Sequence, residues 1–152
     1  MLNNCTITRP KCGEIWMCNL SVKDGSIQSG YRPVFILSNN KNNTYSPTLN
    51  IIPITSKMNK RKLPIHVELW KYKEYGLTMP STMLIEQIMT IPMEYLDRRV
   101  GRIADNDILN SVCRAMEIQF PIMRLLSAIK NNTEKDLTNG NRCGIMCINE
   151  TM

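Results

Sequence analysis

The sequence predicts a mainly β protein of the α+β class, in which a small twisted barrel is followed by a C-terminal helix. Short runs of strand-forming residues, separated by clusters of Gly, Asn, Ser and Pro, extend to residue 91 and favour a barrel over a parallel α/β sheet. Apolar residues then recur at helical spacing. A chain of 152 residues with 43% hydrophobic content suits one compact domain.

The strands are predicted from five segments. "EIWMCNL", residues 14–20, alternates between two faces, and "PVFIL", residues 33–37, is apolar enough to be buried on both. "TLNIIPIT", residues 48–55, and "LPIHVEL", residues 63–69, continue the series. "STMLIEQIMTI", residues 81–91, adds one or two more strands.

Proline and capping residues set the expected limits of the elements. Because Pro53 lacks an N–H for the ladder, we expect its strand to lie at an edge or to carry a bulge. The helical period appears at Ile108, Val112, Ala115, Met116 and Gln119. Asp105 is a suitable N-cap. Since Pro121 cannot donate to the i−4 carbonyl, the helix should break near Gln119 or kink before residues 122–130.

Three segments are expected: an N-terminal extension at 1–12, the barrel with its helix at 13–130, and a polar, mobile tail at 131–152. No apolar run reaches the roughly 18 residues that a membrane span needs. The start also lacks the apolar core of a secretion signal. We therefore expect a cytoplasmic protein without membrane contact.

The six cysteines do not predict a disulfide framework, because thiols stay reduced in the cytoplasm. They do not predict a metal site either. "CGIMC", residues 143–147, has the spacing of a metal-binding pair, but no second clear pair or His cluster completes four ligands. There is no phosphate-binding Gly loop, no Ser/His/Asp set and no carboxylate cluster suited to Mg²⁺. We predict no cofactor and no metal.

The charge points to nucleic acid as the leading class of partner. Lys and Arg number 19 against 13 acidic residues, a net charge of +6 that attracts polyanions. "SKMNKRK", residues 56–62, places four cations in one loop. Such a loop is either simply solvated or follows an RNA backbone.

RNA can be cut without metal because its 2′-hydroxyl is a built-in nucleophile, which DNA lacks. The protein must then supply proton transfer, charge for the phosphate oxygens and a surface that aligns the strand. Arg32 is a candidate for the charge, since Pro33 fixes the backbone after it and arginine pairs with phosphate in a bidentate fork. The alternative is a solvated arginine at a strand start.

Thr55, Ser56 and Lys57 end a strand with two hydroxyls and a cation, which can donate to a phosphate oxygen or, alternatively, cap a turn. His66 is the only histidine and thus the only side chain with an unperturbed pKa near neutrality, although lone histidines are often structural.

Glu86 and Gln87 follow an apolar run and can either hydrogen-bond base edges or pair across strands. From the residues alone, neither interpretation is favoured.

Five fragments, taken in order, resemble the MazF/PemK (Kid) family of toxin–antitoxin endoribonucleases, from about Gly13 to Phe120. They are "GEIWMCNL", "GSIQSGYRPVFILSNN", "SPTLNIIPITSK", "LPIHVEL" and "STMLIEQIMTI". The resemblance implies a homodimeric SH3-like barrel of the MazF/CcdB type with a C-terminal helix. It also implies an mRNA interferase that cuts single-stranded mRNA at short sequences without metal.

The resemblance also implies which residues act. The arginine of the family's G-x-R-P motif is Arg32, and the threonine of its I-T-S segment is Thr55, which gives the expected catalytic pair. The positions expected to line the RNA groove are Ser26, Gln28, Ser56, Lys57, Arg61, His66, Glu86 and Gln87. The family's protein partner is an antitoxin whose acidic, disordered segment folds along the same groove, and a chain at +6 suits it.

Two departures and two alternatives remain. Ile27 replaces an acidic residue of the family's first loop and Met89 replaces a basic one, so the cleavage sequence cannot be transferred from relatives. A CcdB-like toxin would inhibit DNA gyrase by protein contact, but such toxins rely on a Trp-Gly-Ile type of ending and this chain ends "INETM". A non-catalytic RNA-binding or peptide-binding barrel is the second alternative.

Overall fold

The computed structural model describes residues 9–21, 25–57, 62–122 and 124–125. The chain forms two compact units, Met1–Gln119 and Phe120–Met152. In the described part of the second unit, the N–H groups of Arg124 and Leu125 both donate to the carbonyl of Pro121 at 3.1 Å. The predicted tail at 131–152 lies outside the described residues, as do residues 1–8 of the predicted N-terminal extension.

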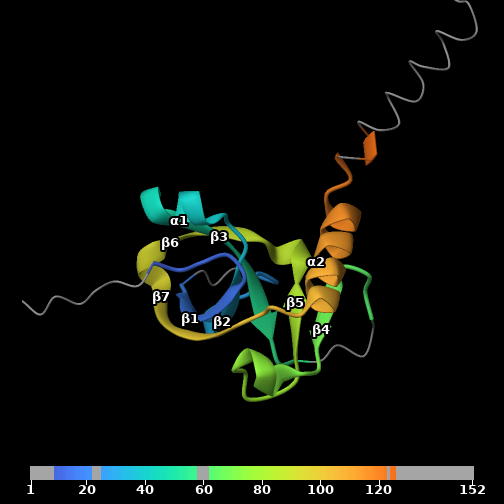
Figure 1. Cartoon of the computed structure of the whole chain (residues 1–152), viewed down its shortest axis with the longest axis horizontal. Coiled ribbons are helices and arrows are strands. Elements are labelled where there is room, and N and C mark those ends of the chain that lie inside the picture. Colours follow the sequence, from blue (N-terminus) through green and yellow to red (C-terminus); the bar gives the residue numbers. More distant parts are fainter. Residues whose placement is uncertain (1–8, 22–24, 58–61, 123, 126–152) are drawn as a thin grey trace, which may run out of the picture. The chain divides into compact units, whose positions relative to one another are not determined.

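Seven strands of the first unit form one antiparallel sheet (Figure 1). The sheet order is β4-β5-β3-β2-β1-β7, and β6 pairs with β3 outside that path. Within the described residues no pairing joins β4 to β7, so the sheet is not closed into a complete barrel. The predicted class, mainly β with a C-terminal helix, is confirmed. The strands are β1 (Glu14–Leu20), β2 (Gly30–Ile36), β3 (Thr48–Thr55), β4 (His66–Leu69), β5 (Ser81–Leu84), β6 (Met89–Pro92) and β7 (Leu96–Arg102).

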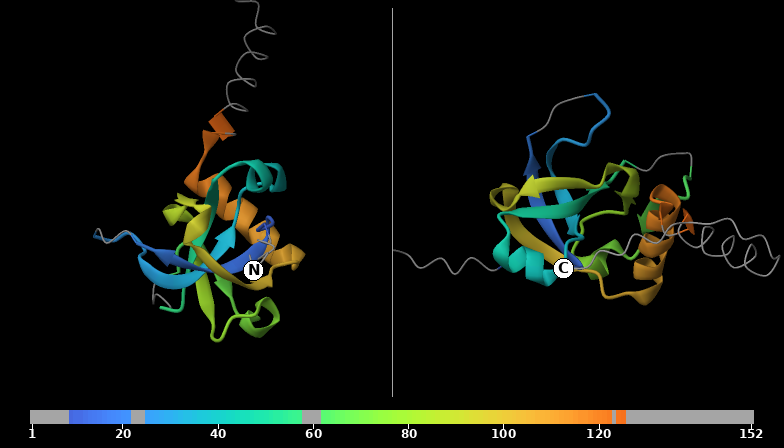
Figure 2. Two further views of the ribbon diagram at one scale, coloured as in Figure 1. Left: turned by 90° about the vertical axis from the view of Figure 1, so that its left-hand side faces the viewer. Right: turned by 90° about the horizontal axis from the view of Figure 1, so that it is seen from above.

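Helical turns join these strands. The helices are α1 (Asn40–Tyr45), the 3₁₀ turns η1 (Tyr72–Tyr75), η2 (Ile85–Gln87) and η3 (Met93–Tyr95), and α2 (Asn106–Gln119). α2 lies beside β4 at one end of the sheet (Figures 1 and 2). The sequence did not predict α1, which begins where the Asn39 side chain accepts a hydrogen bond from the Asn42 N–H at 2.9 Å.

The limits of α2 agree with the prediction. Asp105 Oδ1 accepts a hydrogen bond from the Asp107 N–H at 2.9 Å, and its carbonyl accepts from the Leu109 N–H at 3.0 Å. The first contact satisfies an N–H group of the first turn that has no helical partner, and the second is the first i→i−4 hydrogen bond of the helix. The helix ends at Gln119, two residues before Pro121.

The core lies on both faces of the central strands because alternate residues point to opposite sides. On one face, Ile15, Phe35 and Ile52 pack with Val112 and Ala115 of α2. The other face gathers Trp16, Cys18, Val34, Ile36, Leu49, Ile51 and Ile91. The prediction that the second strand is buried on both faces is therefore confirmed.

Pro53 does not lie in an edge strand, which corrects that expectation. β3 is interior, with Val34 of β2 opposite Pro53 on one side. On the other side the partner of β3 changes: β6 pairs as far as Ile51, and β5 pairs from Ile54 onward. Pro53 lies between the segments that pair with these two neighbours. No strand of the described residues lies opposite it on that side, so the N–H that proline lacks is not needed for pairing.

β7 was not predicted, because "LDRRVGR" is charged and lacks the apolar alternation of a strand. It forms by antiparallel pairing with β1, and a polar contact supports the pair, in which Arg99 Nε donates to Glu14 Oε1 at 2.8 Å. A side chain at Gly101 would place its Cβ 2.1 Å from the Tyr75 carbonyl oxygen, so only glycine lets η1 and β7 approach this closely. β4 is also shorter than predicted, beginning at His66 rather than residue 63.

Candidate active site

The strand register brings Arg32 and Thr55 to the same place. Val34 lies opposite Pro53 in the last pair between β2 and β3, and Arg32 and Thr55 each lie two residues from that pair. Side chains two residues apart share a face of a strand, so both side chains leave the sheet on the face of Val34 and Pro53. The pairing itself stops at Val34 and Pro53, so the two strands have separated where these side chains emerge.

A cleft occupies that separation, with a volume of about 280 Å³. We call it the Arg32–Thr55 cleft. Its far wall comes from the segment before β5, which is distant in sequence from both strands. The lining residues are Tyr31, Arg32, Pro33, Ile54, Thr55, Ser56, Lys57, Leu77, Thr78, Met79 and Ser81. Of the predicted site residues, Arg32, Thr55, Ser56 and Lys57 therefore lie together.

Arg32 is held by neutral acceptors. Its Nε donates to the Ser29 carbonyl at 2.8 Å, Nη2 donates to the same oxygen, and Nη1 donates to Gln28 Oε1. Among the described residues no carboxylate pairs with it. A carbonyl and an amide fix the guanidinium without cancelling its charge, which remains available to an anion. Partial burial lowers the pKa of Arg32, yet arginine starts so high that it stays protonated near neutrality.

The loop that carries Ser29 is itself tied to the other side of the site. Gln87 Oε1 accepts a hydrogen bond from the Gln28 N–H at 2.7 Å, and Gln87 Nε2 donates to the Ser26 carbonyl at 3.1 Å. Three predicted site residues, Ser26, Gln28 and Gln87, thus form a chain of hydrogen bonds that ends at Arg32. The Gln87 side chain is thus engaged in hydrogen bonds to a distant loop and does not lie free at a groove.

The Thr55 hydroxyl oxygen accepts a hydrogen bond that helps to fix its orientation. Its Oγ1 accepts a hydrogen bond from the Lys57 N–H at 3.2 Å, which is the turn cap that the sequence allowed as an alternative. A hydroxyl that accepts in this way keeps its own hydrogen for donation. The cap and a catalytic role are therefore compatible. Ser56 and Lys57 are exposed on the rim of the cleft.

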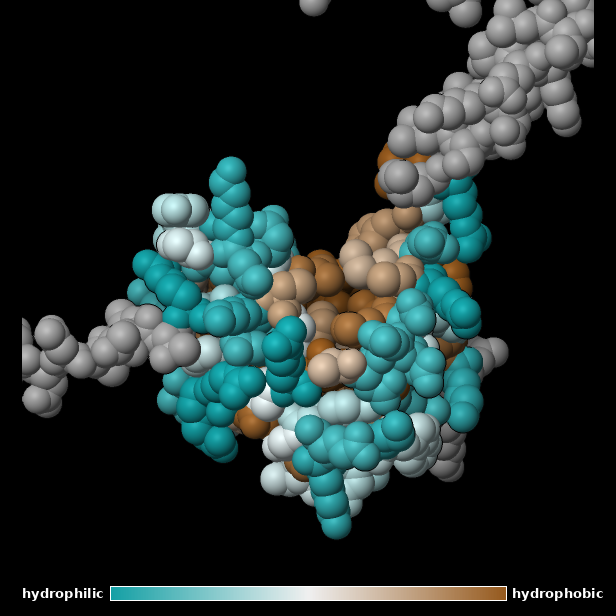
Figure 3. Space-filling view, viewed as in Figure 1, coloured by the Kyte–Doolittle hydropathy of each residue, from teal (hydrophilic) through white to brown (hydrophobic). Residues whose placement is uncertain are grey.

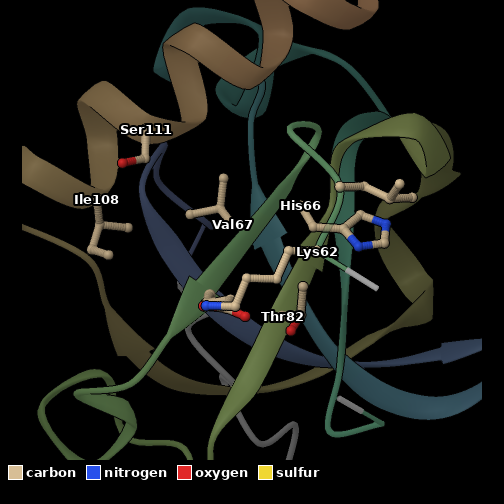
Figure 4. A pocket seen from close by; sticks show the side chains of 8 residues that line it. Lys62, His66, Val67, Thr82, Ile108 and Ser111 are labelled. Atoms are coloured by element: carbon tan, nitrogen blue, oxygen red, sulfur yellow. The ribbon is translucent and has the colours of Figure 1, made fainter. Parts of the chain in front are cut away.

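His66 and Glu86 pair with each other. His66 Nε2 lies 3.0 Å from Glu86 Oε1, and the His66 side chain is 6% exposed. The other carboxylate oxygen, Glu86 Oε2, is buried and has no hydrogen-bond partner among the described residues. His66 lines a second pocket of about 230 Å³ rather than the Arg32–Thr55 cleft. Figure 4 shows His66 and Val67 pointing in different directions from β4, with Ile108 and Ser111 of α2 on the Val67 side.

Arg61, the remaining predicted site residue, lies outside the described residues. The sequence did not identify the Ser29 carbonyl or the wall at Leu77, Thr78 and Met79. Local patterns contain no signal for either, because a backbone carbonyl has no side-chain signature and the wall is brought in by folding.

The described residues contain no group of three or more His, Cys, Asp and Glu side chains placed to hold a metal ion. Cys12, Cys18 and Cys113 are free thiols, and the closely spaced cysteines at 143 and 147 lie outside the described residues. No helix in the described ranges is both long and apolar enough to cross a membrane.

Comparison with known proteins identifies the family. The family model described as "PemK-like, MazF-like toxin of type II toxin-antitoxin system" matches residues 11–120, which is most of the chain. The chain belongs to this family. The match covers β1 through α2, and thus all the elements that build the Arg32–Thr55 cleft.

Solved structures with the same fold include MazF toxins. The toxin MazF-mt6 of Mycobacterium tuberculosis has a TM-score of 0.59 at 23% identity, covering 71% of this chain and 96% of that one. MazF from Deinococcus radiodurans has a TM-score of 0.59 at 21% identity, covering 71% and 93%. A mycobacterial endoribonuclease in complex with its cognate antitoxin has a TM-score of 0.57 at 19% identity, covering 74% and 95%. At these identities the likeness shows the shared MazF fold, which agrees with the predicted fold class.

Proposed function

We propose that this toxin is an endoribonuclease, an mRNA interferase that cuts single-stranded mRNA through the ribose 2′-hydroxyl, with Arg32 and Thr55 as catalytic residues. The observation that carries the proposal is that both residues line one cleft. A guanidinium and a hydroxyl from two strands then face the same small volume, which is what a phosphate undergoing substitution requires.

In the proposed step the 2′-oxygen attacks the adjacent phosphorus, the 2′-proton leaves to a base, and the bond from phosphorus to the 5′-oxygen breaks as that oxygen takes up a proton. Arg32 stabilises the charge on the phosphate oxygens, because its neutral acceptors leave the positive charge uncompensated. Thr55 donates its hydroxyl hydrogen to one of those oxygens. The nucleophile comes from the substrate, so the step needs no metal to activate water.

The remaining predicted residues hold the strand. Ser56 and Lys57 on the rim suit contact with the phosphates next to the cut site. Gln28 and Gln87 position the loop around Arg32 and belong to the proposed RNA-binding set. His66 and Glu86 act as a pair on the neighbouring pocket, and Ser26 and Arg61 complete the proposed RNA-binding set. Such a set can select a short sequence, which makes the cleavage sequence-specific.

Two partners belong to this proposal. The first is a second copy of the chain: Figure 3 shows apolar side chains gathered in a hollow between α1 and α2, and covering such a surface favours a homodimer. The second is a cognate MazE-like antitoxin with an acidic, disordered segment, which the net charge of +6 suits. An antitoxin complex is known for the mycobacterial endoribonuclease of the same fold.

We further propose that the functional barrel spans residues 13–130 and acts in the cytoplasm.

The test is a cleavage assay with purified protein in excess EDTA, on single-stranded RNA and on DNA of the same sequence. We expect cuts in RNA alone, with Arg32→Ala lowering the rate by at least about a hundredfold while the circular dichroism spectrum is unchanged. A metal requirement or equal cutting of DNA would contradict the mechanism. Inhibition of gyrase without any RNA cleavage would favour the CcdB-like alternative, and RNA binding without cleavage would favour a non-catalytic barrel.

A further inference from the structure

Trp70 is an exposed tryptophan whose ring is nevertheless held in place. It is 58% exposed and follows directly after β4. Its indole Nε1–H donates to Glu68 Oε2 at 3.0 Å. The same oxygen accepts a contact from Lys62 Nζ at 3.2 Å, so one carboxylate fixes both the ring and a cation beside it. A fixed ring loses little conformational freedom when a planar ligand stacks on it.

The register connects this ring to the Arg32–Thr55 cleft. Thr55 of β3 lies opposite Thr82 of β5, and Thr82 lies opposite Glu68 of β4. These three side chains therefore form one row on the same face of the sheet. Two strand spacings of about 4.8 Å place Glu68 roughly 10 Å from Thr55. Trp70 follows Leu69, which lies opposite Ser81 in the sheet. Ser81 is the first residue of β5 and lines the cleft.

The surroundings of Trp70 combine exposed lysines with a second aromatic ring. Lys62 is 79% exposed, and the next residue along the chain from Trp70 is Lys71, at 61%. Each lysine has an acidic partner, Glu68 and Asp105 respectively, which holds its ammonium group near the surface without burying it. Lys73 lies 5.9 Å from the centre of the Tyr72 ring. Aromatic faces combined with cations are what single-stranded nucleic acids bind without a fixed sequence.

We propose that Trp70 is a nucleobase-stacking subsite for the RNA strand, outside the Arg32–Thr55 cleft, with Lys62 contacting the adjacent phosphate. This inference rests on the proposed function, because it assumes that the strand already occupies the cleft. The subsite binds one base by its face, so it adds affinity for the flanking part of the strand rather than choice of base.

The binding experiment uses a mixed-sequence single-stranded oligodeoxynucleotide, which has no 2′-hydroxyl and is not cut by the proposed mechanism. The chain contains two tryptophans, and Trp16 is only 8% exposed. The difference in emission between the wild type and Trp70→Phe therefore isolates Trp70. We expect the oligonucleotide to quench this emission.

Affinity measurements on variants complete the test. Trp70→Ala should weaken binding by about 5-fold to 150-fold, the range supplied by one base stacked on an aromatic ring. Trp70→Phe keeps a ring and should retain most of the affinity. Tyr45→Ala is the matched control, because Tyr45 is an aromatic side chain that is 82% exposed in α1 and should leave affinity unchanged. If Trp70→Ala fails to fold, the quenching of the Trp70 emission and the affinity of Trp70→Phe test the subsite instead.

The outcomes separate this inference from the proposed function. If the wild type cuts RNA and binds the oligonucleotide while the Trp70 emission and the Trp70→Ala affinity stay unchanged, the subsite is overturned and the nuclease remains. If the wild type neither cuts RNA nor binds the oligonucleotide, both proposals fail. If the Trp70 emission changes on dilution of the protein and not on addition of oligonucleotide, the ring belongs to a protein interface and the subsite is likewise overturned.

Discussion

The side chain of Gln87 holds the loop that holds Arg32. Gln87 Oε1 accepts a hydrogen bond from the Gln28 N–H at 2.7 Å, and Gln28 Oε1 in turn accepts from Arg32 Nη1. Two residues separated by 59 positions in sequence are thereby linked at the site. The position of the guanidinium thus depends on a 3₁₀ turn that contributes no side chain to the Arg32–Thr55 cleft.

Gln87→Ala should therefore slow cleavage without unfolding the protein. Loss of both loop contacts lets the Arg32 guanidinium move away from the phosphate, and we expect a fall in rate of about tenfold to a hundredfold. Single-turnover cleavage measures the rate, and thermal unfolding measures stability. Gln119→Ala, at the end of α2, is the control and should behave as wild type. An unchanged rate in Gln87→Ala would mean that the loop is positioned by other contacts.

Thr55 offers a test of the hydroxyl alone. Thr55→Val keeps the branched shape at the end of β3 but removes the hydrogen donated to the phosphate oxygen, and we expect at least about a hundredfold lower rate. Thr55→Ser restores the hydroxyl and should recover activity to within about tenfold. Equal rates for the Val variant and the wild type would remove Thr55 from the catalytic pair.

Glu14 makes the stability of the fold depend on pH. Burial alone would raise the pKa of Glu14, but the Lys11 N–H, the Trp16 indole and the Arg99 guanidinium outweigh it and hold the pKa below its ordinary value. A depressed pKa in the folded state gives stability that is complete above the unfolded-state pKa of about 4.3 and is lost as the pH falls through the folded-state value.

Urea unfolding at pH 7 and at pH 3 measures this effect. Glu14→Gln replaces one of the two accepting carboxylate oxygens with an NH₂ group that donates, so we expect a loss of about 1–3 kcal/mol in the free energy of unfolding at pH 7. The variant should also show a smaller difference between the two pH values than the wild type. The same pH dependence in both proteins would assign the effect to other carboxylates.

Cys18 should resist alkylation in the native protein. Burial raises the pKa of Cys18 to about 12, and the side chain is fully buried between β2 and β7, so neither the thiolate nor access is available near neutral pH. Cys113 on α2 is exposed and serves as the internal control. Peptide mapping after brief iodoacetamide treatment should find label at Cys113 and none at Cys18. Comparable labelling of both would show that β1 opens readily.

Gly101 tests the close approach of β7 to η1. Gly101→Ala would place a Cβ 2.1 Å from the Tyr75 carbonyl oxygen, so one backbone segment must shift. We expect a loss of about 1–3 kcal/mol in the free energy of unfolding. Gly25→Ala is the comparison: its added Cβ meets nothing within 4 Å, so it shows only the cost of a side chain at a φ of +51°, about 1–2 kcal/mol, which the loss in Gly101→Ala should exceed. Equal stability of Gly101→Ala and the wild type would contradict the described packing.

The elements that could be predicted were those with a local signal. "TLNIIPIT" became β3 with the predicted bounds because its apolar β-branched residues suit a buried, pleated strand and are visible in the local sequence. Asp105 and Pro121 likewise set the limits of α2 by capping and by a missing N–H. β7 had no such signal, since Arg99 is satisfied only when folding brings Glu14 to it.

The site divides in the same way. Arg32 and Thr55 could be named from short motifs, and each lies two residues from the last pair between β2 and β3, Val34 and Pro53. The partners of Gln87 and Glu86 could not be predicted, because Gln28 and His66 reach them through the packing of separate strands. Residues on the wall of the Arg32–Thr55 cleft, such as Thr78, have an ordinary sequence context and acquire their place only in three dimensions.

The change of partner along β3 has a consequence for how the proposed site can vary. Since β3 leaves β2 after Pro53 and joins β5 from Ile54, Arg32 and Thr55 are attached to two diverging ribbons of one sheet. The width of the Arg32–Thr55 cleft is then set by the separation of these two parts of the sheet. Rim and loop residues can then be exchanged without altering the spacing of the two proposed catalytic groups.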